Sequence, residues 1–395
     1  MELGAVKDLP RKDIVNEWWS EVKENFWQDS QPPMKQLLKE LMQQSLIAEI
    51  EQMRRRDVIE DSPIISRNGF YRRSLITRYG AIEDIRVPRL RRGCFKTKVF
   101  RRYQRCEQLV ENLIRDIFLS GVSTRRVGAA VCALLETKIS STTVSRITKH
   151  LDGAVRAFTK RALLDEYQYL ILDGIRLKIR HNGSYHTRTV LVAYGITLFG
   201  KRELIDFRHS QGESQNAWEL LLNQLYQRGL EGKNLKLIVM DGARGLQAAA
   251  EVVYPEAKVQ RCWVHKLRNV ANLCPKKYQA CVRKARNIYL STNRTQALAA
   301  FKRWKQAWVL RCPKAVACLE KDLDEMLNFL DCPKEHRIKI RTTNAIERSF
   351  REVRRRTNVF SCFSNTASTD RIIYAIFTHL NNGWKDALLP GFTQF

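Results

Sequence analysis

Strand-like and helix-like segments alternate between residues 165 and 261, and this alternation limits the fold more than any other feature of the chain. Aliphatic runs such as YLILD and LIVMD have the length and composition of buried strands, and the stretches between them have helical spacing. A mixed order of this kind is typical of an α/β domain. We expect three strands, a helix, a strand, a helix and a strand, over residues 167–180, 187–198, 202–209, 214–228, 235–242, 246–252 and 257–261.

Two aspartates stand out within this order, which matches a ribonuclease H-like domain whose central strand carries Asp173. Asp173 and Asp241 each follow an aliphatic run and precede a glycine, so we expect both at strand ends, with more strand-like residues after the Asp173-Gly174 pair. If the two strands are adjacent and parallel, both carboxylates emerge at the same edge of the sheet. Asp-Gly is also a common pair in tight turns, so each aspartate alone has a simpler interpretation as a turn residue.

A third acid, Glu347, lies in the basic stretch RTTNAIERSFREVRRRTN. Ile346, Phe350 and Val353 recur at helical spacing and predict the buried stripe of a helix. Glu347 is one position round from that stripe, which places it at the rim of the buried face. Asn344 and Glu347 also fit a capping box, so the glutamate has a structural interpretation too.

The net charge indicates the partner. The 395-residue chain has 69 basic and 41 acidic residues, a formal charge of +28, which points first to nucleic acid and second to an anionic membrane surface. Two observations argue against the membrane interpretation: no apolar run reaches about 18 residues, and the N-terminus does not resemble a signal peptide. The ten cysteines form no CxxC pair, which predicts reduced thiols in a cytoplasmic, nucleoid-associated setting.

Together, the three acids suit metal-dependent phosphoryl transfer on DNA. Asp173, Asp241 and Glu347 offer the hard oxygen ligands that Mg²⁺ prefers and that Mn²⁺ also accepts. Two such ions in one site can stabilise the attacking and leaving oxygens together. Water or a DNA 3′-hydroxyl would then be the nucleophile, and no side chain needs to become covalent.

The segment over residues 67–105 is strongly basic, with aromatic residues between its arginines. Apolar positions alternate on both sides of Tyr79-Gly80, which predicts a short hairpin followed by an extended arm. A phosphate-contacting surface is the functional interpretation, and a solvated loop is the alternative. The candidate DNA contacts in this segment are Arg72, Arg73, Arg89, Arg91 and Arg92.

Residues 106–160 have the pattern of short helices, with Ser123 and Ser140-Ser141 as caps. A first helix is expected to use Leu109, Val110, Leu113, Ile114, Ile117 and Phe118 as one apolar face. Two further helices separated by a polar turn have the spacing of a helix-turn-helix; the alternative is an ordinary helical bundle. The side chains predicted to face a major groove are Thr142, Thr143, Ser145, Arg146 and Lys149.

Several multi-residue blocks resemble the DDE transposases of bacterial insertion sequences, specifically the Mutator type. The matching stretches include YLILDGIRLKIR, LIVMDGARGLQAA, YPEAKVQRCWVHKLRNV and RTTNAIERSFREVRRRTNVF, and the likeness runs from about residue 65 to 380. The resemblance implies that Asp173, Asp241 and Glu347 are the three catalytic acids. It also implies binding to the terminal inverted repeats of an element, strand cleavage at its ends, transfer of a 3′-hydroxyl into target DNA, a circular intermediate, and action as a homodimer or higher multimer.

Two further sets of residues belong to the matching blocks. Cys262 and His265 could form half of a zinc site with Cys274 and Cys281, but that spacing is unconvincing and a structural role near the catalytic sheet is the preferred interpretation. Basic residues after Glu347 are expected to contact DNA phosphates. These are Arg348, Arg351, Arg354, Arg355 and Arg356.

The expected architecture is α/β plus all-α: a ribonuclease H-like domain interrupted by an all-helical insertion and preceded by a DNA-binding region. An alternative function is a repressor or architectural DNA-binding protein that keeps a transposase fold, and a third is a related nuclease. The expected segments are an N-terminal helical region (1–66), for which dimerisation is one interpretation and a core role the other, the basic hairpin and arm (67–105), the helix-turn-helix domain (106–160), the first catalytic part (161–262), the helical insertion (263–335), the last catalytic part (336–385) and a tail (386–395).

Overall fold

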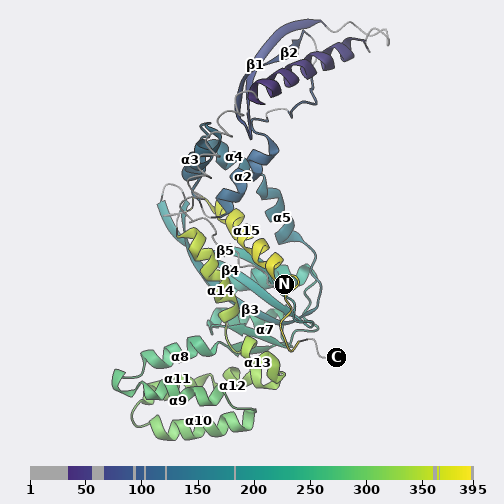
Figure 1. Ribbon diagram of the computed structural model, residues 1–395. Coiled ribbons are helices and arrows are strands. Elements are labelled where there is room, and N and C mark those ends of the chain that lie inside the picture. Colours follow the sequence, from purple (N-terminus) through teal and green to yellow (C-terminus); the bar gives the residue numbers. More distant parts are fainter. Residues whose placement is uncertain are drawn as a thin grey trace, which may run out of the picture. The chain divides into compact units, whose positions relative to one another are not determined.

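The computed structural model divides the chain into two compact units, residues 1–148 and 149–395 (Figure 1). It describes residues 34–55, 66–91, 95–101, 104–120, 122–181, 184–358, 363 and 365–392. The predictions for residues 1–33 and for Arg92 lie outside these ranges.

The first unit contains a helix over residues 34–55 and an antiparallel hairpin of β1 (Arg67–Thr77) and β2 (Gly80–Leu90). Thr77 pairs with Gly80, so the hairpin predicted around Tyr79-Gly80 is confirmed. Glycine suits this turn because the φ of Gly80 is +102°. A small core joins the hairpin to the helix, formed by Leu46, Leu75, Ile82, Ile85, Val87 and Phe100.

Three short helices complete this unit, namely α2 (Gln108–Leu119), α3 (Thr124–Leu135) and α4 (Ser141–Lys149). The Ser123 hydroxyl accepts a hydrogen bond from the amide of Arg126, and the Ser140 hydroxyl accepts one from the amide of Thr143. Both predicted caps therefore form. The apolar face predicted for α2 is too wide. Val110, Ile114 and Phe118 are buried, whereas Leu109 and Leu113 are exposed, because only the stripe at every fourth residue is covered.

The second unit is built on a mixed five-stranded sheet in the order β5-β4-β3-β6-β7. Neighbours β5, β4 and β3 are antiparallel, whereas β3, β6 and β7 are parallel. The predicted strands all form, and the strand that carries Asp173 is central. The strands are β3 (Tyr167–His181), β4 (Ser184–Thr197), β5 (Arg202–Ser210), β6 (Leu237–Met240) and β7 (Lys258–Arg261).

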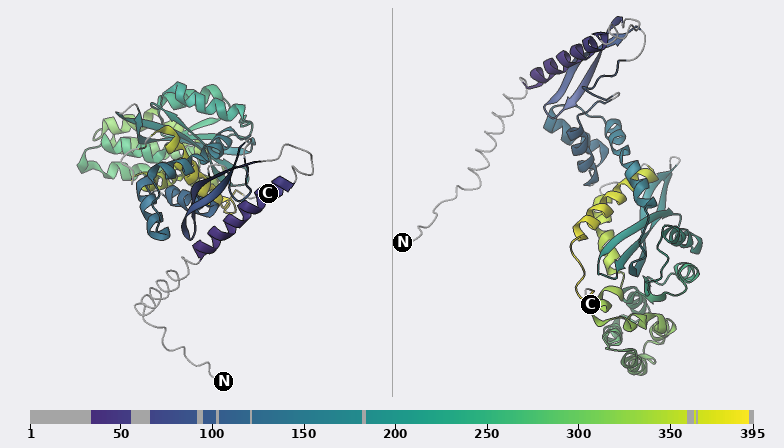
Figure 2. Two further views of the ribbon diagram at one scale, coloured as in Figure 1. Left: turned by 90° about the horizontal axis from the view of Figure 1, so that it is seen from above. Right: turned by 90° about the vertical axis from the view of Figure 1, so that its right-hand side faces the viewer.

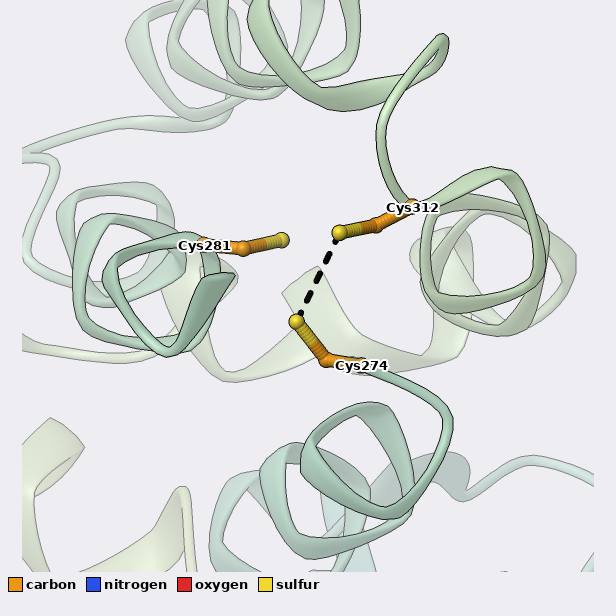
Figure 3. A group of neighbouring side chains, drawn as sticks. All are labelled: Cys274, Cys281 and Cys312. Atoms are coloured by element: carbon orange, nitrogen blue, oxygen red, sulfur yellow. Dashed lines mark hydrogen bonds between the residues drawn. The ribbon is translucent and has the colours of Figure 1, made fainter. Parts of the chain in front are cut away.

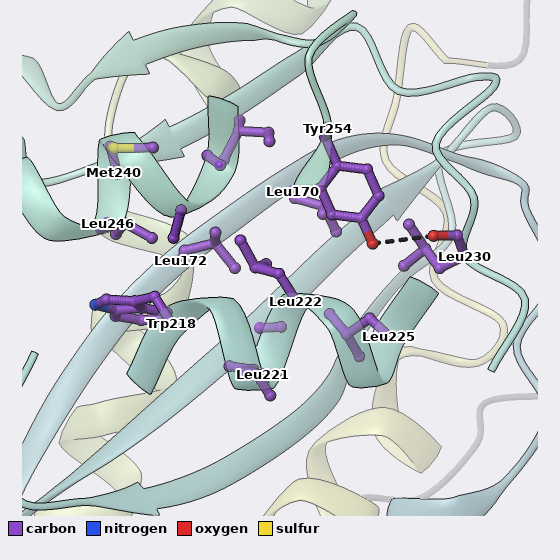
Figure 4. Close-up of a cluster of buried hydrophobic side chains, with 14 of the residues drawn as sticks. Leu170, Leu172, Trp218, Leu221, Leu222, Leu225, Leu230, Met240, Leu246 and Tyr254 are labelled. Carbon is purple, nitrogen blue, oxygen red and sulfur yellow. Dashed lines mark hydrogen bonds between the residues drawn. The ribbon is translucent and has the colours of Figure 1, made fainter. Parts of the chain in front are cut away.

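One face of the sheet packs against α6 (Gln215–Gln227) and α7 (Arg244–Val253). Leu170 and Leu172 of β3 and Met240 of β6 enter this core, which also contains Trp218 of α6 (Figure 4). Because alternate residues of a strand point to opposite faces, Tyr169 and Ile171 point the other way.

The opposite face is covered by α14 (Asn344–Thr357) and α15 (Thr366–Trp384), drawn in yellow (Figure 2, right). Tyr194 of β4 packs edge-on against Trp384, and Phe207 of β5 against Phe377. Helix α5 (Leu151–Lys160) joins α15 through two hydrogen bonds from the Arg371 guanidinium to the carboxylate of Asp152.

The chain between β7 and α14 is helical, as the sequence predicts. Two 3₁₀ turns, Lys276–Tyr278 and Asn328–Asp331, separate some of the helices. No helix in the described ranges is long and apolar enough to cross a membrane. The helices of this segment are α8 (Trp263–Asn272), α9 (Ala280–Tyr289), α10 (Arg294–Trp308), α11 (Pro313–Lys321), α12 (Leu323–Leu327) and α13 (Lys334–Ile340).

Candidate active site

The register of the parallel strands sets the positions of the two aspartates. Pairing between β3 and β6 ends at Ile171 and Val239, and Asp173 and Asp241 each lie two residues further along. Leu172 and Met240 point into the core beneath α6 and α7. By alternation, the aspartates lie on the other face of the sheet, the one that α14 covers.

The prediction of strand ends is right for Asp241 and wrong for Asp173. Strand β6 ends at Met240, directly before Asp241. Strand β3 instead continues to His181, and Asp173 pairs with Val192 in the middle of its hairpin with β4. Because β3 outlasts β6, the edge of the parallel part falls within β3, and Asp173 lies just beyond that edge.

The third acid is held by side chains from two elements. The Oε1 atom of Glu347 lies 3.1 Å from Nε2 of His265 in α8 and accepts a 3.1 Å hydrogen bond from the Thr343 hydroxyl. Beneath it, Ile346, Phe350 and Val353 are buried, so the predicted core stripe of α14 is confirmed.

The capping box predicted with Asn344 does not form. The residue at the N-cap is Thr343, and Asn344 is the first residue of the helix. The Thr343 carbonyl accepts a hydrogen bond from the amide of Glu347. The helical hydrogen bonds therefore begin one residue earlier than expected. Its hydroxyl contacts the Glu347 carboxylate, so this acid is tied to the residue that begins its own helix.

Cys262 and His265 join the end of the sheet to the start of α14. The Cys262 sulfur accepts a hydrogen bond from the amide of Thr343 at 3.3 Å and lies 3.4 Å from its hydroxyl oxygen. His265 contacts Glu347 directly. The structure places neither residue with Cys274 or Cys281, which cluster elsewhere with Cys312.

Asp173 lies close enough to the other acids for their charges to act on it. Burial raises the pKa of Asp173 to about 7, and the charges of Asp241, Glu347 and Glu213 add to that rise. The amide of Gly174 opposes it by donating to the Asp173 carboxylate at 2.8 Å. A cation at this position would offset the cost of burying an ionised carboxylate.

Glu213 is a fourth acid that the sequence analysis missed. Its Oε1 atom would lie 3.0 Å from a Cβ atom added at Gly174, so it borders the backbone next to Asp173. Burial and the charge of Asp241 raise the pKa of Glu213. The only local signal was its position directly before Ser214, which caps α6 as predicted.

Asp241 also occupies a tight turn. Its Oδ1 atom accepts the amide of Ala243 at 3.0 Å, and the φ of Gly242 is +96°. The side chain of Arg261 lies against Gly242 and pairs with Asp322 at 3.0 Å. The turn interpretation and the active-site interpretation of Asp241 are therefore compatible, because the turn leaves the second carboxylate oxygen available.

The carboxylates do not converge on one ion-sized space. Among the described residues, only Cys274, Cys281 and Cys312 form a group of three or more His, Cys, Asp or Glu residues whose ligand atoms all lie within 4.8 Å of one another. The oxygen atoms of Asp173, Asp241 and Glu347 are therefore more widely spaced than the ligands of one ion.

The arginines that follow Glu347 differ in exposure. Arg348, Arg351, Arg354 and Arg355 are exposed on α14, although Arg355 pairs with Glu352 at 2.7 Å. Arg356 is half-buried and also pairs with Glu352. A cavity of about 670 Å³ lies beside this helix. Its lining combines basic and aromatic side chains, among them Arg202, Arg341, Arg348, Trp263, Tyr289 and Trp384.

The candidate DNA contacts of the hairpin are partly engaged within the first unit. Arg72 pairs with Asp84 at 3.1 Å, and Arg89 lies over the ring of Tyr71. Arg73 stacks on Phe100 and donates to the carbonyl of Gln104, which leaves it less able to contact a phosphate. Arg91 is exposed.

The predicted recognition residues lie on α4 opposite its buried side chains. Val144 and Ile147 are buried, as expected for the core side of the helix. Thr142, Arg146 and Lys149 are exposed, whereas Thr143 and Ser145 are half-buried.

Comparison with known proteins identifies the family. The family model "Transposase, Mutator family" matches residues 17–387. The chain is 35% identical to the transposase for insertion sequence element ISRM5 of Rhizobium meliloti, over 90% of this chain and 89% of the relative. It is 34% identical to the transposase for IS256 in transposon Tn4001 of Staphylococcus aureus, and 35% identical to that for IS406 of Burkholderia multivorans, each over 80% of this chain and 82% of the relative. The chain therefore belongs to the Mutator family of insertion-sequence transposases.

Proposed function

We propose that this transposase is of the DDE type, with a ribonuclease H-like catalytic domain. It binds the terminal inverted repeats of its element, cleaves a strand at each end and joins the 3′-hydroxyl to target DNA. The observation that carries the proposal is the equivalent register of Asp173 and Asp241, each two residues past the last pair between β3 and β6, on the face where α14 presents Glu347.

The sheet order supports the fold assignment. Three antiparallel strands followed by two parallel ones, with β3 central, is the arrangement expected of a ribonuclease H-like domain. The helical segment enters between β7 and α14, and the amide of Trp263 donates to the carbonyl of Arg341. The chain thus leaves and re-enters the catalytic unit at one place, as an inserted segment should.

The donor set fits divalent metal. Asp173, Asp241 and Glu347 offer only oxygen ligands, which suits Mg²⁺ or Mn²⁺. In this proposal a pair of ions is shared among the three acids. When bound, such ions would stabilise negative charge on the attacking and leaving oxygens.

The protein's own groups orient that centre. His265 and Thr343 hold the carboxylate of Glu347, and the amide of Gly174 holds that of Asp173. The exposed arginines of α14 offer guanidinium groups to the phosphate backbone beside the acids. The scissile phosphate would then be positioned by α14 and the acids together.

Recognition of the ends is assigned to the first unit. In this proposal α3 and α4 form a helix-turn-helix, with Arg146, Lys149 and Thr142 on its exposed side. The basic hairpin supplies phosphate contacts through Arg72, Arg89 and Arg91. A homodimer or larger multimer would bring two ends together, in the cytoplasm at the nucleoid.

Two alternatives predict different outcomes on DNA. A repressor or architectural protein would bind the ends and leave them intact. A related nuclease would cut without regard to the terminal repeat.

The test uses a duplex in which one terminal repeat joins flanking DNA, incubated with the full chain and Mg²⁺. We expect a nick at the junction that leaves a 3′-hydroxyl, and no nick in a duplex with a scrambled repeat. Binding without cleavage would favour the repressor, and equal cleavage of both duplexes would favour the nuclease.

A further inference from the structure

Three cysteine side chains from different parts of the helical segment meet at one point (Figure 3). Cys274 follows α8, Cys281 lies in the first turn of α9, and Cys312 directly precedes α11. Their sulfur atoms all lie within 4.8 Å of one another, and those of Cys274 and Cys312 are 3.5 Å apart. Cys274 and Cys281 are close in sequence, whereas Cys312 lies beyond α10, so no short motif contains all three cysteines.

The cluster is enclosed by the protein. Cys281 is 0% exposed, Cys312 2% and Cys274 6%. The sulfur of Cys274 also lies 3.2 Å from the carbonyl oxygen of Tyr278, which places an oxygen acceptor at the edge of the cluster. The neighbouring Trp304 donates to the carbonyl of Cys281, so the helix backbone at this point is fixed from a second side.

These distances match the ligand spacing of a metal–thiolate centre. Zinc–sulfur bonds of about 2.3 Å at tetrahedral angles place neighbouring sulfur atoms about 3.8 Å apart. Two sulfur atoms at 3.5 Å with a third within 4.8 Å need only small rotations about the side-chain bonds to reach that spacing. Buried thiols that serve only as apolar filling have no reason to direct three sulfur atoms to one point.

We propose that Cys274, Cys281 and Cys312 bind one zinc ion that fixes α8, α9 and α11 to one another. Each thiol loses its proton to solvent as its sulfur–zinc bond forms, and no electron is transferred. The fourth ligand is a water molecule or the carbonyl oxygen of Tyr278. This site is separate from the acids, and it does not depend on the function proposed for them.

The site has a consequence for α8. The N-terminal end of this helix carries His265, which contacts Glu347, and its C-terminal end leads into Cys274. A metal ion bound at the C-terminal end of this short helix would restrict the motion of its N-terminal end. Zinc would thereby stabilise the helical segment and hold His265 in place.

The test is the metal content of the full chain, purified under reducing conditions without chelator and then given zinc and desalted. Elemental analysis should find one zinc ion per chain, and a mercurial reagent that modifies thiols should release it. Cys281→Ser and Cys312→Ser should each lose the bound zinc. Cys318→Ser, which changes a half-exposed thiol of α11 outside the cluster, should keep it.

A second measurement covers variants that do not fold. Cobalt added to the wild-type chain should give the visible and near-ultraviolet bands of sulfur-bound, tetrahedral Co²⁺. A chelator should lower the melting temperature of the wild-type chain and leave that of Cys312→Ser unchanged. A folded wild-type chain that binds neither zinc nor cobalt would overturn the proposal, as would a disulfide between Cys274 and Cys312 in the reduced preparation.

Discussion

Nε2 of His265 lies 3.1 Å from Oε1 of Glu347, so the first turn of α8 contacts the acid on α14. The two residues are separated by the whole helical segment, yet the backbone beside them is also joined, from the amide of Trp263 to the carbonyl of Arg341. The ends of the segment therefore meet under the third acid. A movement of the helical segment would therefore change the position of the Glu347 carboxylate.

The first prediction concerns this contact. Replacing His265 by glutamine should lower the rate of strand cleavage by roughly 10- to 100-fold, the range for partners that orient a metal-binding residue. It should also raise the Mg²⁺ concentration needed for half-maximal rate, which a purely structural defect would not do. The control is His379→Gln, an exposed residue of α15. An unchanged Mg²⁺ dependence in His265→Gln would contradict a positioning role.

The second prediction concerns the turn after Asp241. At Gly242 the φ of +96° and a Cβ contact of 3.1 Å with Arg261 make any side chain costly. Gly242→Ala should lower the free energy of unfolding by about 1–3 kcal/mol. Gly153→Ala is the matched control, since it lies within α5 with open space around it and should be neutral or stabilising. Urea denaturation distinguishes them, and equal midpoints would count against strain at Gly242.

The third prediction is a pH dependence at the C-terminal end. The ring of His336 is stacked on Phe392, accepts from the Tyr169 hydroxyl at 2.8 Å and donates to the carbonyl of Gly391 at 3.1 Å. Burial lowers the pKa of His336 below 6.5, although nearby Glu335 opposes this and Lys236 adds to it. The neutral ring is thus the folded form.

Its contribution to stability is complete above pH 6.5 and is lost as the pH falls through the lower, folded-state pKa, because the unfolded chain then binds a proton that the folded chain resists. The amide of Leu389 donates to the carbonyl of Gly200, and its protection factor against hydrogen exchange should therefore fall as the pH is lowered. His336→Gln should flatten this pH dependence. The same pH dependence in the wild-type chain and in His336→Gln would show that another group causes it.

The fourth prediction tests the recognition helix. Arg146 is exposed on α4, whereas Val144 and Ile147 anchor the other side of the helix. Arg146→Ala should weaken binding to the cognate end by about tenfold or more, and binding to random DNA by less. Arg125→Ala, an exposed arginine of α3, is the control and should weaken both to a similar, small extent. Equal losses for Arg146→Ala on both DNAs would reduce it to a phosphate contact.

Elements of the catalytic unit could be predicted because local patterns determine them. The aliphatic runs before Asp173 and Asp241 form β3 and β6, and the stripe of Ile346, Phe350 and Val353 is buried as expected. In each case the spacing of apolar residues indicates which face of that helix or strand is buried. No distant partner is needed to interpret them.

What could not be predicted depends on contacts between distant segments. Asp173 lies just beyond the point where the pairing of β3 with β6 ends, and the length of that pairing depends on both strands. Glu213 approaches Gly174 only after α6 packs on the sheet. The meeting of Cys274 and Cys312 likewise requires the helices of the segment to be folded together.

In the proposed mechanism, Asp173, Asp241 and Glu347 act together as one metal-dependent site. The most direct test is cleavage at the element's end in Mg²⁺ by Asp173→Asn, Asp241→Asn and Glu347→Gln, with binding to the same DNA measured in parallel. Glu256→Gln, which changes an exposed acid outside the site, serves as the control. We expect each of the three variants to bind the end and fail to cut it, whereas the control should do both. Cleavage at the wild-type rate by any one of the three would remove that residue from the site.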